Sequence, residues 1–428
     1  MKKTTLSLVA SAIVASSVSA ATITLYQDPA TGQVFTTPAE GRVEMGDFID
    51  AKKAHVESLK MKDEITSSLK SVKVKSKAKS IDFSGTHYLG YTMARPDITS
   101  GTVDDSSGFE MRRNYVQVKG YLNDKDYLRV TLDSTKELAS DPGSDGKTKG
   151  YAEVFVKYAY LWLDNVLPYT GVEAGIAHRP WIDYEEHNAW LYRSINKVAL
   201  EHKNTATEHG PDLVNSADFG VNFKTKTQYF SSEIGLFNGE GYHADKKAAN
   251  QKNSGEMSVE YRLTGHILGS GKNVGKYKRT EDTYAHISTY GLMSDNHKDD
   301  NISVGDSAEY DRKFYGIHAV YNNPMFLLAG QIFTAEDETK KGTKTEIDGW
   351  SINSEFRPIK DWTVIARYDV HEKEKNNILI EDATQLMYGV AYKYSDNVTF
   401  ILSNKNVEDD IVKNAEKTVT MLTTEIKW

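Results

Sequence analysis

The chain has 428 residues, a formal net charge of −8 at pH 7 and no cysteine. The absence of cysteine excludes cysteine-ligated zinc, haem attached through C-x-x-C-H and cysteine nucleophiles. The negative charge argues against nucleic acid as a partner, because proteins that bind polyanions carry an excess of Lys and Arg.

The first twenty residues predict a cleavable secretory signal peptide. Lys2 and Lys3 precede an apolar run over residues 6–15, and small residues follow up to Ala20. The run is too short for a membrane helix, and no later segment offers about 20 uninterrupted apolar residues. We therefore expect an exported chain without a helical span. Removal of the two lysines would take its net charge from −8 to −10.

Residues 21–80 predict a separate N-terminal periplasmic segment. Residues 23–26 and 33–36 read as a hairpin around the Pro- and Gly-containing turn 27–32. Residues 50–74 show a helical pattern, with apolar residues three or four positions apart. The heptads break at Asp63 and Thr66, so a coiled coil between subunits and a solvated amphipathic tether both remain open.

From residue 81 to 428, apolar and polar residues alternate in one segment after another, which predicts strands. Three clear faces are those of residues 257–267, 362–370 and 386–394. In a fourth, Val154, Val156, Tyr158, Tyr160 and Trp162 are expected on one face, opposite Glu153 and Lys157. Residues 418–428 alternate as well and end on Trp428, which resembles the closing strand of Gram-negative outer-membrane barrels.

The connections between these strands alternate in length. Short turns are expected at 123–126, 164–168, 322–324, 358–361 and 395–397, and long loops at 94–108, 135–150, 180–216, 239–255, 295–312, 336–346, 371–383 and 407–417. Outer-membrane barrels have short periplasmic turns and long surface loops. The pattern predicts an all-β, transmembrane antiparallel barrel of about sixteen strands with a water-filled lumen. Residues 268–282 are the exception, being long where a short turn is expected.

Composition supports the barrel. The chain is polar, with a mean hydropathy of −0.54, yet contains 25 Tyr and 6 Trp. A soluble protein this polar would bury few aromatic residues, whereas Tyr and Trp suit the two membrane interfaces of a barrel.

The third surface loop, residues 180–216, is the main candidate for a constriction. Either it folds into the lumen, or it stays outside and packs against a neighbouring subunit. Six acids against Arg193, Lys197 and Lys203 in this loop predict weak charge selectivity. The predicted pore-lining residues are Tyr184, Glu185, Glu186, His187, Arg193 and Lys197 of the loop, and Arg113, Lys119, Arg129, Arg262 and Arg367 of the strands.

Four motifs between residues 109 and 241 resemble those of the phosphate-selective porins O and P. They are Phe109–Gly120, Leu167–Gly175 continued by His178–Trp181 and Glu185-Glu186, Asp218–Val221, and Gly235–Gly241. The resemblance implies a sixteen-stranded trimer with an N-terminal periplasmic segment, and selection of phosphate. Phosphate selection needs a dense lining of Arg and Lys, which the acidic third loop does not provide.

An enzyme is not expected, because neither G-x-S-x-G nor H-E-x-x-H occurs. No cofactor and no bound metal are expected either. Asp299-Asp300 and Asp141 with Asp145-Gly146 are acidic enough to hold Ca²⁺ loosely, but such clusters are usually only solvated.

The sequence thus predicts an outer-membrane porin for passive diffusion of small hydrophilic solutes and ions. Its expected partners are those solutes, outer-membrane lipid, lipopolysaccharide and further copies of itself in a homotrimer. The alternatives are a phosphate- or anion-selective porin, and an adhesive or structural outer-membrane protein without transport.

Overall fold

The computed structural model describes residues 23–48, 60, 77–96, 106–134, 139–142, 148–151, 154–202, 210–239, 241, 257–298, 309–339, 341–411 and 417–428. The chain divides into two compact units, residues 1–76 and 77–428. The predicted signal peptide, the predicted helix at 50–74 apart from Lys60, and the acidic sites at Asp145-Gly146 and Asp299-Asp300 lie outside the described residues, so these remain predictions.

The first unit contains a three-stranded sheet in the order β2-β1-β3, with β1 (Ile23–Gln27), β2 (Val34–Phe35) and β3 (Val43–Phe48). Gln27 pairs with Val34, which confirms the predicted hairpin. The third strand was not predicted, because Gly46 and the charged residues around it obscure the alternation. It pairs with β1 through a register shift beside Leu25.

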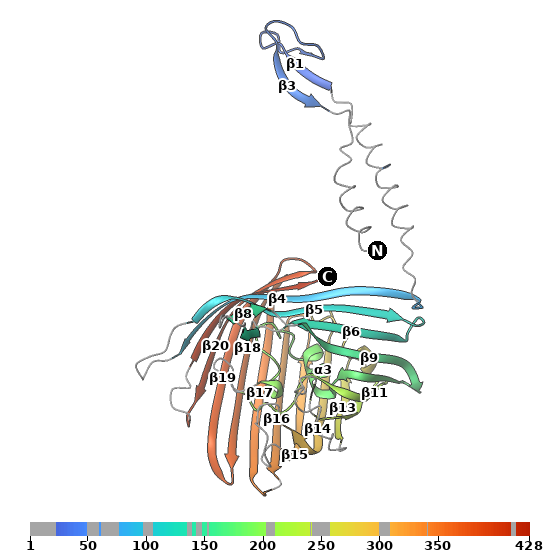
Figure 1. Ribbon diagram of the computed structural model, residues 1–428, viewed down its shortest axis with the longest axis vertical. Coiled ribbons are helices and arrows are strands. Elements are labelled where there is room, and N and C mark those ends of the chain that lie inside the picture. The colour runs from blue at the N-terminus through green and yellow to red at the C-terminus, as the bar shows by residue number, and fades with distance from the viewer. Residues whose placement is uncertain are drawn as a thin grey trace. The chain divides into compact units, whose positions relative to one another are not determined.

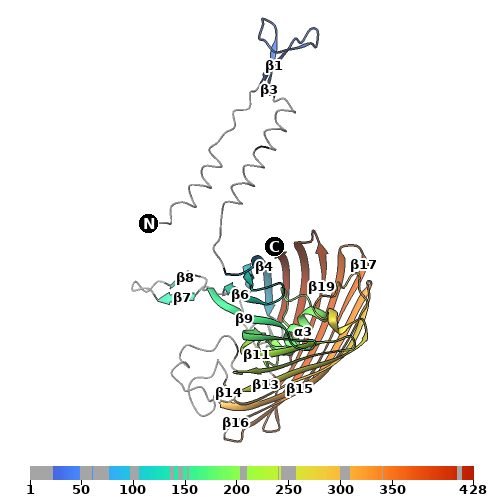
Figure 2. The same cartoon turned by 90° about the vertical axis from the view of Figure 1, so that its right-hand side faces the viewer.

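The second unit is a closed antiparallel barrel of sixteen strands, which confirms the predicted fold (Figure 1 and Figure 2). In chain order the strands are β4 (Ser80–Pro96), β5 (Ser106–Tyr121), β6 (Tyr127–Ser134), β9 (Val154–Leu167), β10 (Thr170–His178), β11 (Ala217–Lys226), β12 (Phe230–Phe237), β13 (Ser258–Leu268), β14 (Tyr284–Lys298), β15 (Glu309–Asn322), β16 (Phe326–Thr339), β17 (Lys344–Ile359), β18 (Trp362–Lys375), β19 (Ile378–Lys393), β20 (Val398–Asp409) and β21 (Lys417–Lys427). A small hairpin, β7 (Ala139–Pro142) and β8 (Thr148–Tyr151), lies in the connection between β6 and β9.

The last strand closes the barrel against the first. β21 pairs with β4 from Lys417↔Pro96 to Lys427↔Thr86. Trp428 then exchanges two backbone hydrogen bonds with Gly85, of 2.9 and 3.2 Å, and its indole N–H donates to His87 Nε2 at 2.8 Å. The C-terminal aromatic residue therefore forms part of the seam.

The strands present an apolar exterior and a polar interior. Along β13, Val259, Leu263 and Ile267 are exposed, whereas Glu260 and Arg262 between them are buried. The same alternation of exposed apolar and buried residues occurs on β18 and β19, as predicted. A belt of exposed Leu, Ile, Val, Phe, Trp and Tyr on a folded chain requires a non-aqueous surrounding, which a bilayer provides. Among the described residues, no helix is long and apolar enough to cross a membrane.

The predicted face of β9 is wrong beyond Val156. Val154 and Val156 are exposed, but Tyr158 and Tyr160 are only 5% and 2% exposed. The register against β6 shifts here, because Thr131 pairs with Tyr158 while Leu132 pairs with Val156. The extra residue, Lys157, forms a bulge that turns the following tyrosines inward.

Two of the predicted long loops are strands instead. β16 and β17 are separated by residues 340–343 alone, and β18 and β19 by Asn376 and Asn377. Both asparagines have positive φ, 50° and 62°, as a tight hairpin turn requires. These strand ends are rich in charged side chains, and for that reason the sequence predicted loops there. The long connection between β13 and β14 is confirmed as an enlarged turn, so the strand count was correct.

Candidate pore constriction

The third loop, here called loop 3 (residues 180–216), begins where β10 ends, and it folds into the barrel. Pro180 occupies the first turn of helix α3 (Pro180–Asn188), a position that suits its fixed φ. The backbone N–H of Arg179 donates to Ser216 O at 3.3 Å, so the two ends of the loop meet. The Arg179 guanidinium donates to Glu260 at 2.5 and 2.8 Å and attaches this base to β13. Both views show α3 within the ring of strands (Figure 1 and Figure 2).

One side of α3 packs on the inner faces of β13, β14 and β15. The Trp181 ring stacks on Tyr290, with centroids 3.7 Å apart. Tyr184 is hydrogen-bonded to His286 Nδ1 at 3.0 Å, and its ring lies 4.6 Å from the Arg262 guanidinium carbon. Trp181 and Tyr184 are 3% and 1% exposed. Burial of this aromatic area stabilises the packing of the helix on the wall.

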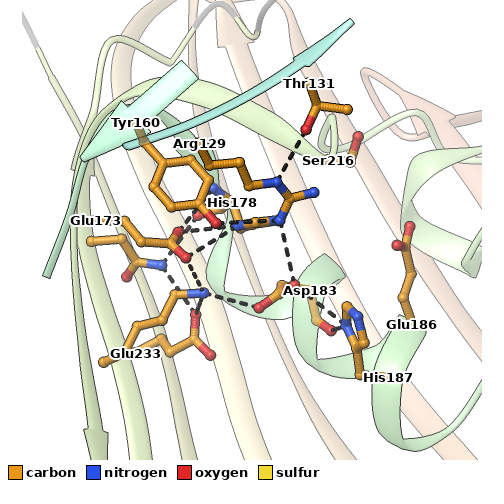
Figure 3. A network of polar contacts seen from close by, with 12 residues as sticks. Arg129, Thr131, Tyr160, Glu173, His178, Asp183, Glu186, His187, Ser216 and Glu233 are labelled. Atoms are coloured by element: carbon orange, nitrogen blue, oxygen red, sulfur yellow. Dashed lines mark hydrogen bonds and ion pairs between the residues drawn. The ribbon is translucent and has the colours of Figure 1, made fainter. Parts of the chain in front are cut away.

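The other side of α3 meets a network of polar residues on β10, β11 and β12 (Figure 3). Lys224 Nζ lies 2.9 Å from Asp183, 3.1 Å from Glu173 and 3.3 Å from Glu233. His178 Nδ1 lies 3.1 Å from Glu173, while Arg129 reaches His178 Nε2 at 3.3 Å. Because Arg129 is only a donor, His178 Nε2 accepts and Nδ1 carries the proton. Burial raises the pKa of Asp183, but the Lys224 ammonium outweighs this effect and holds that pKa well below its usual range.

The described parts of loop 3 after α3, residues 189–202 and 210–216, are held inside the barrel by side chains of the wall. Arg367 donates to Lys197 O at 2.6 Å, Asn353 to Ala189 O at 3.0 Å, and Arg312 to Leu213 O at 3.0 Å. Apolar side chains of the loop, including Ile195 and Leu213, are almost fully buried. Loop 3 therefore has a packed apolar core of its own against the inside of the barrel, and backbone carbonyls within the lumen are satisfied by the wall.

Glu185 is a buried carboxyl in this packed region. It is 2% exposed, and Gln331 Nε2 donates to its Oε1 at 2.8 Å. Burial raises the pKa of Glu185 to about 7, although Arg367 acts in the opposite direction. Glu201 shows the contrasting case: burial is outweighed by Arg193, whose guanidinium lies 2.5 Å from the carboxylate, and the pKa of Glu201 is lowered.

A second element enters the lumen from the opposite end. This enlarged turn, residues 269–283, contains Val274, which is 4% exposed and packs in the same apolar cluster as loop 3. Gly275 N donates to Asn188 Oδ1 at 3.3 Å at the end of α3. Arg279 forms an ion pair with Glu355 on β17. Loop 3 and the enlarged turn thus meet inside the barrel and narrow its bore together.

The inner face of β4, β5, β6 and β9 has a different character. We call it the tyrosine wall, defined by Tyr88, Tyr115, Tyr121, Tyr127, Tyr158 and Tyr160. Successive rings lie close together, with centroid distances of 5.4 Å for Tyr121–Tyr127, 6.3 Å for Tyr127–Tyr160 and 6.5 Å for Tyr115–Tyr158. Arg113, Lys119 and Arg129 lie on the faces of these rings.

The structure places the eleven predicted pore-lining residues in two groups. Five are buried between loop 3 and the wall: Tyr184, Glu185, Arg193, Arg262 and Arg367. Six retain exposure inside the barrel or at the edge of α3: Arg113, Lys119, Arg129, Glu186, His187 and Lys197. Of the exposed group, Glu186 pairs with Arg193, and His187 contacts Asp183. Their roles in conduction remain predictions.

Several residues that shape this site were not predicted. Arg179, Arg312 and Asn353 attach loop 3 to the strands, and Tyr158 and Tyr160 belong to the tyrosine wall. Arg312 and Asn353 occupy inward positions of β15 and β17, so strand alternation contained a usable signal for these two, whereas Arg179 lies between β10 and α3. The two tyrosines were placed outside because the bulge at Lys157 cannot be read from alternation.

The fold is that of porin-type outer-membrane barrels. Its solved neighbours include the anion-selective porin from Comamonas acidovorans, at 11% identity and TM-score 0.55, covering 82% of this chain and 99% of that one. Outer-membrane expressed OmpT of Vibrio cholerae matches at 14% identity and TM-score 0.53, covering 83% and 99%. The outer membrane channel DcaP of Acinetobacter baumannii matches at 7% identity and TM-score 0.50, covering 82% and 97%. No protein-family model and no curated protein matches the sequence.

Proposed function

We propose that this protein is an outer-membrane porin that lets small hydrophilic solutes and ions diffuse passively through a narrow channel. The observation that supports this most strongly is the closed barrel with an apolar exterior, a polar interior and loop 3 folded inside it. A folded, hydrogen-bonded loop within a polar lumen favours a channel with a constriction over a purely structural barrel. The predicted signal peptide supports export to the outer membrane, and the motif resemblance supports a trimer.

The narrowness of the bore supports small solutes. Loop 3 and the enlarged turn cover the inner faces of β11 to β20 with packed side chains. We infer that passage runs along the tyrosine wall, where Arg113, Lys119 and Arg129 remain partly exposed. We expect a low single-channel conductance compared with a barrel of equal strand number and an empty lumen.

Reconstitution in planar bilayers tests the proposal. Purified full-length protein should insert from detergent and give discrete conductance steps, which should close in groups of three if the channel is a trimer. An adhesive or structural barrel would give no steps, and that result would contradict the proposal.

Selection of phosphate is the second candidate function, favoured by the motifs on β5, β10, β11 and β12. The described lumen alternates acids with bases rather than presenting a dense ladder of cations, as the network around Lys224 illustrates. We therefore propose weak charge selectivity. Saturable block of the chloride current by sub-millimolar phosphate would favour the phosphate-selective alternative instead.

A further inference from the structure

Inward-facing cations divide into two classes. On the side covered by loop 3, arginines are neutralised by carboxylates at short range. Arg312 lies 2.7 Å from Asp337, Arg367 2.8 Å from Asp369 and Arg262 3.1 Å from Glu233. Arg179 and Arg193 are paired in the same way. Each of these arginines contributes little electrostatic field in the bore, because a buried ion pair is close to neutral at a distance.

The cations of the tyrosine wall are not neutralised in this way. Within the described part of the chain, Arg113, Lys119 and Arg129 form no ion pair with a carboxylate. All three lie over aromatic rings, and Arg129 also donates to uncharged groups, Thr131 Oγ1 at 3.0 Å and Tyr160 OH at 3.2 Å. The Arg113 guanidinium carbon lies 4.3 Å from the Tyr115 centroid, Lys119 Nζ 4.9 Å from Tyr127, and the Arg129 carbon 4.8 Å from Tyr158. Cation–π contact orients a cation but does not cancel its charge.

The arrangement along the strands concentrates the positive charge. Lys119 and Arg129 are direct cross-strand partners on β5 and β6. Like charges placed opposite each other destabilise a sheet, so this pairing is costly to the fold. Asp82 lies opposite Lys119 on β4, and Asp133 is occupied by the backbone N–H groups of Asn114 and Ser134, at 3.0 and 2.9 Å. Acids thus lie near the three cations without pairing with them.

The acids of loop 3 contribute less to the bore than their number suggests. Glu186 forms an ion pair with Arg193, Glu201 lies 2.5 Å from the same guanidinium, and Asp183 lies 2.9 Å from Lys224. Glu185 is buried behind the loop. Of the six acids of loop 3, Asp183, Glu186 and Glu201 are therefore in ion pairs with a base, and Glu185 is buried.

We infer that Arg113, Lys119 and Arg129 form an anion track on the tyrosine wall, and that this track, rather than loop 3, determines the charge preference of the channel. The solutes it favours are small anions such as chloride and short carboxylates. An anion passing along the wall meets three partly exposed cationic side chains that form no ion pair with a carboxylate of the described residues. The inference rests on the proposed channel function and specifies its selectivity.

Reversal potentials across a gradient of potassium chloride, and then of potassium acetate, test the track. The wild-type channel should prefer the anion in both salts. Replacing Arg113, Lys119 and Arg129 together by Gln should lower the anion-to-cation permeability ratio by about threefold or more, because a unit charge within about 5 Å changes the energy of an ion in water by more than its thermal energy. The matched control is Lys313→Gln, which removes one cation from the exposed outer face of β15.

Two further variants keep the test decisive. Replacing Arg113 and Arg129 by Lys preserves the charge and should preserve the preference, even where the triple Gln variant fails to fold. Glu186→Gln should shift the ratio less than the triple variant. An unchanged ratio in the triple variant, a cation preference in the wild type, or a larger effect of Glu186→Gln would overturn the track. Absence of any conductance in the wild type would instead refute the proposed channel function.

Discussion

The two halves of the barrel interior use charge for different purposes. On the wall that loop 3 covers, Arg312, Arg367 and Arg262 are each paired with a carboxylate and are nearly fully buried. On the tyrosine wall, Arg113, Lys119 and Arg129 are partly exposed and lie on aromatic rings. The contrast shows that a count of charged residues in a lumen says little about selectivity. What matters is which charges remain without a counter-charge once the loop has packed.

Loss of the aromatic anchor of loop 3 should have the largest effect. Trp181→Ala removes the ring stacked 3.7 Å from Tyr290, at a position that is 3% exposed. We expect a destabilisation of about 3–5 kcal/mol, as for other buried Trp residues, and a larger and noisier single-channel conductance as loop 3 loosens. Denaturant unfolding and bilayer recording measure the two effects. Leu191→Ala, in the same loop but 40% exposed, should change neither, and equal effects of both would refute a packed loop 3.

The next largest effect is expected on stability, when one arginine from each wall is replaced by Gln. Arg312→Gln leaves Asp337 without its partner and removes the donor to Leu213 O, so we expect a loss of about 3–5 kcal/mol. Arg113→Gln removes a cation that has no paired carboxylate and should cost much less stability while altering ion selectivity. Chemical unfolding of both variants separates the two classes. Similar losses of stability would remove the distinction between the walls.

The buried carboxyl of loop 3 should make stability depend on pH. The pKa of Glu185 rises from 4.5 to about 7, so the folded protein keeps a proton that the unfolded chain has released. The free energy of unfolding should therefore fall as pH rises from 4.5 to about 7 and then level off, by about 3 kcal/mol for this group. Glu185→Gln should flatten that interval. Glu281→Gln, in the exposed part of the enlarged turn, should leave the pH profile as it is in the wild type.

A smaller effect is expected at the seam beside the tyrosine wall. A Cβ on Gly85 would lie 2.5 Å from the Trp428 ring, whereas a Cβ on Gly108 of the adjacent strand would meet nothing within 4 Å. Gly85→Ala should therefore cost about 1–3 kcal/mol, and Gly108→Ala little. Unfolding midpoints in detergent measure the difference. Equal midpoints would show that closure of the barrel does not depend on the packing of Trp428.

Alternation with period two, combined with the alternation of short and long connections, was sufficient to predict the barrel, its strand count and its closing strand, because a membrane outside and water inside impose opposite polarity on neighbouring residues. It did not predict where the strands of β16 to β19 end, since charged residues occur both in loops and in strands that extend beyond the bilayer. The bulge at Lys157 was not predicted either, because one extra residue reverses the inward or outward direction of every later side chain without changing the composition.

Local sequence thus determined the cylinder and identified loop 3 as its main insertion, together with some of the charged residues that face inward. Only the tertiary structure decided which of those residues meet each other. Glu185, Arg193 and Arg367 become parts of a packed core. Among the described residues, Arg113, Lys119 and Arg129 instead remain without a paired carboxylate. The physical reason is that ion pairing joins residues far apart in the chain, such as Arg179 and Glu260, and no pattern along the sequence specifies which cation will be neutralised.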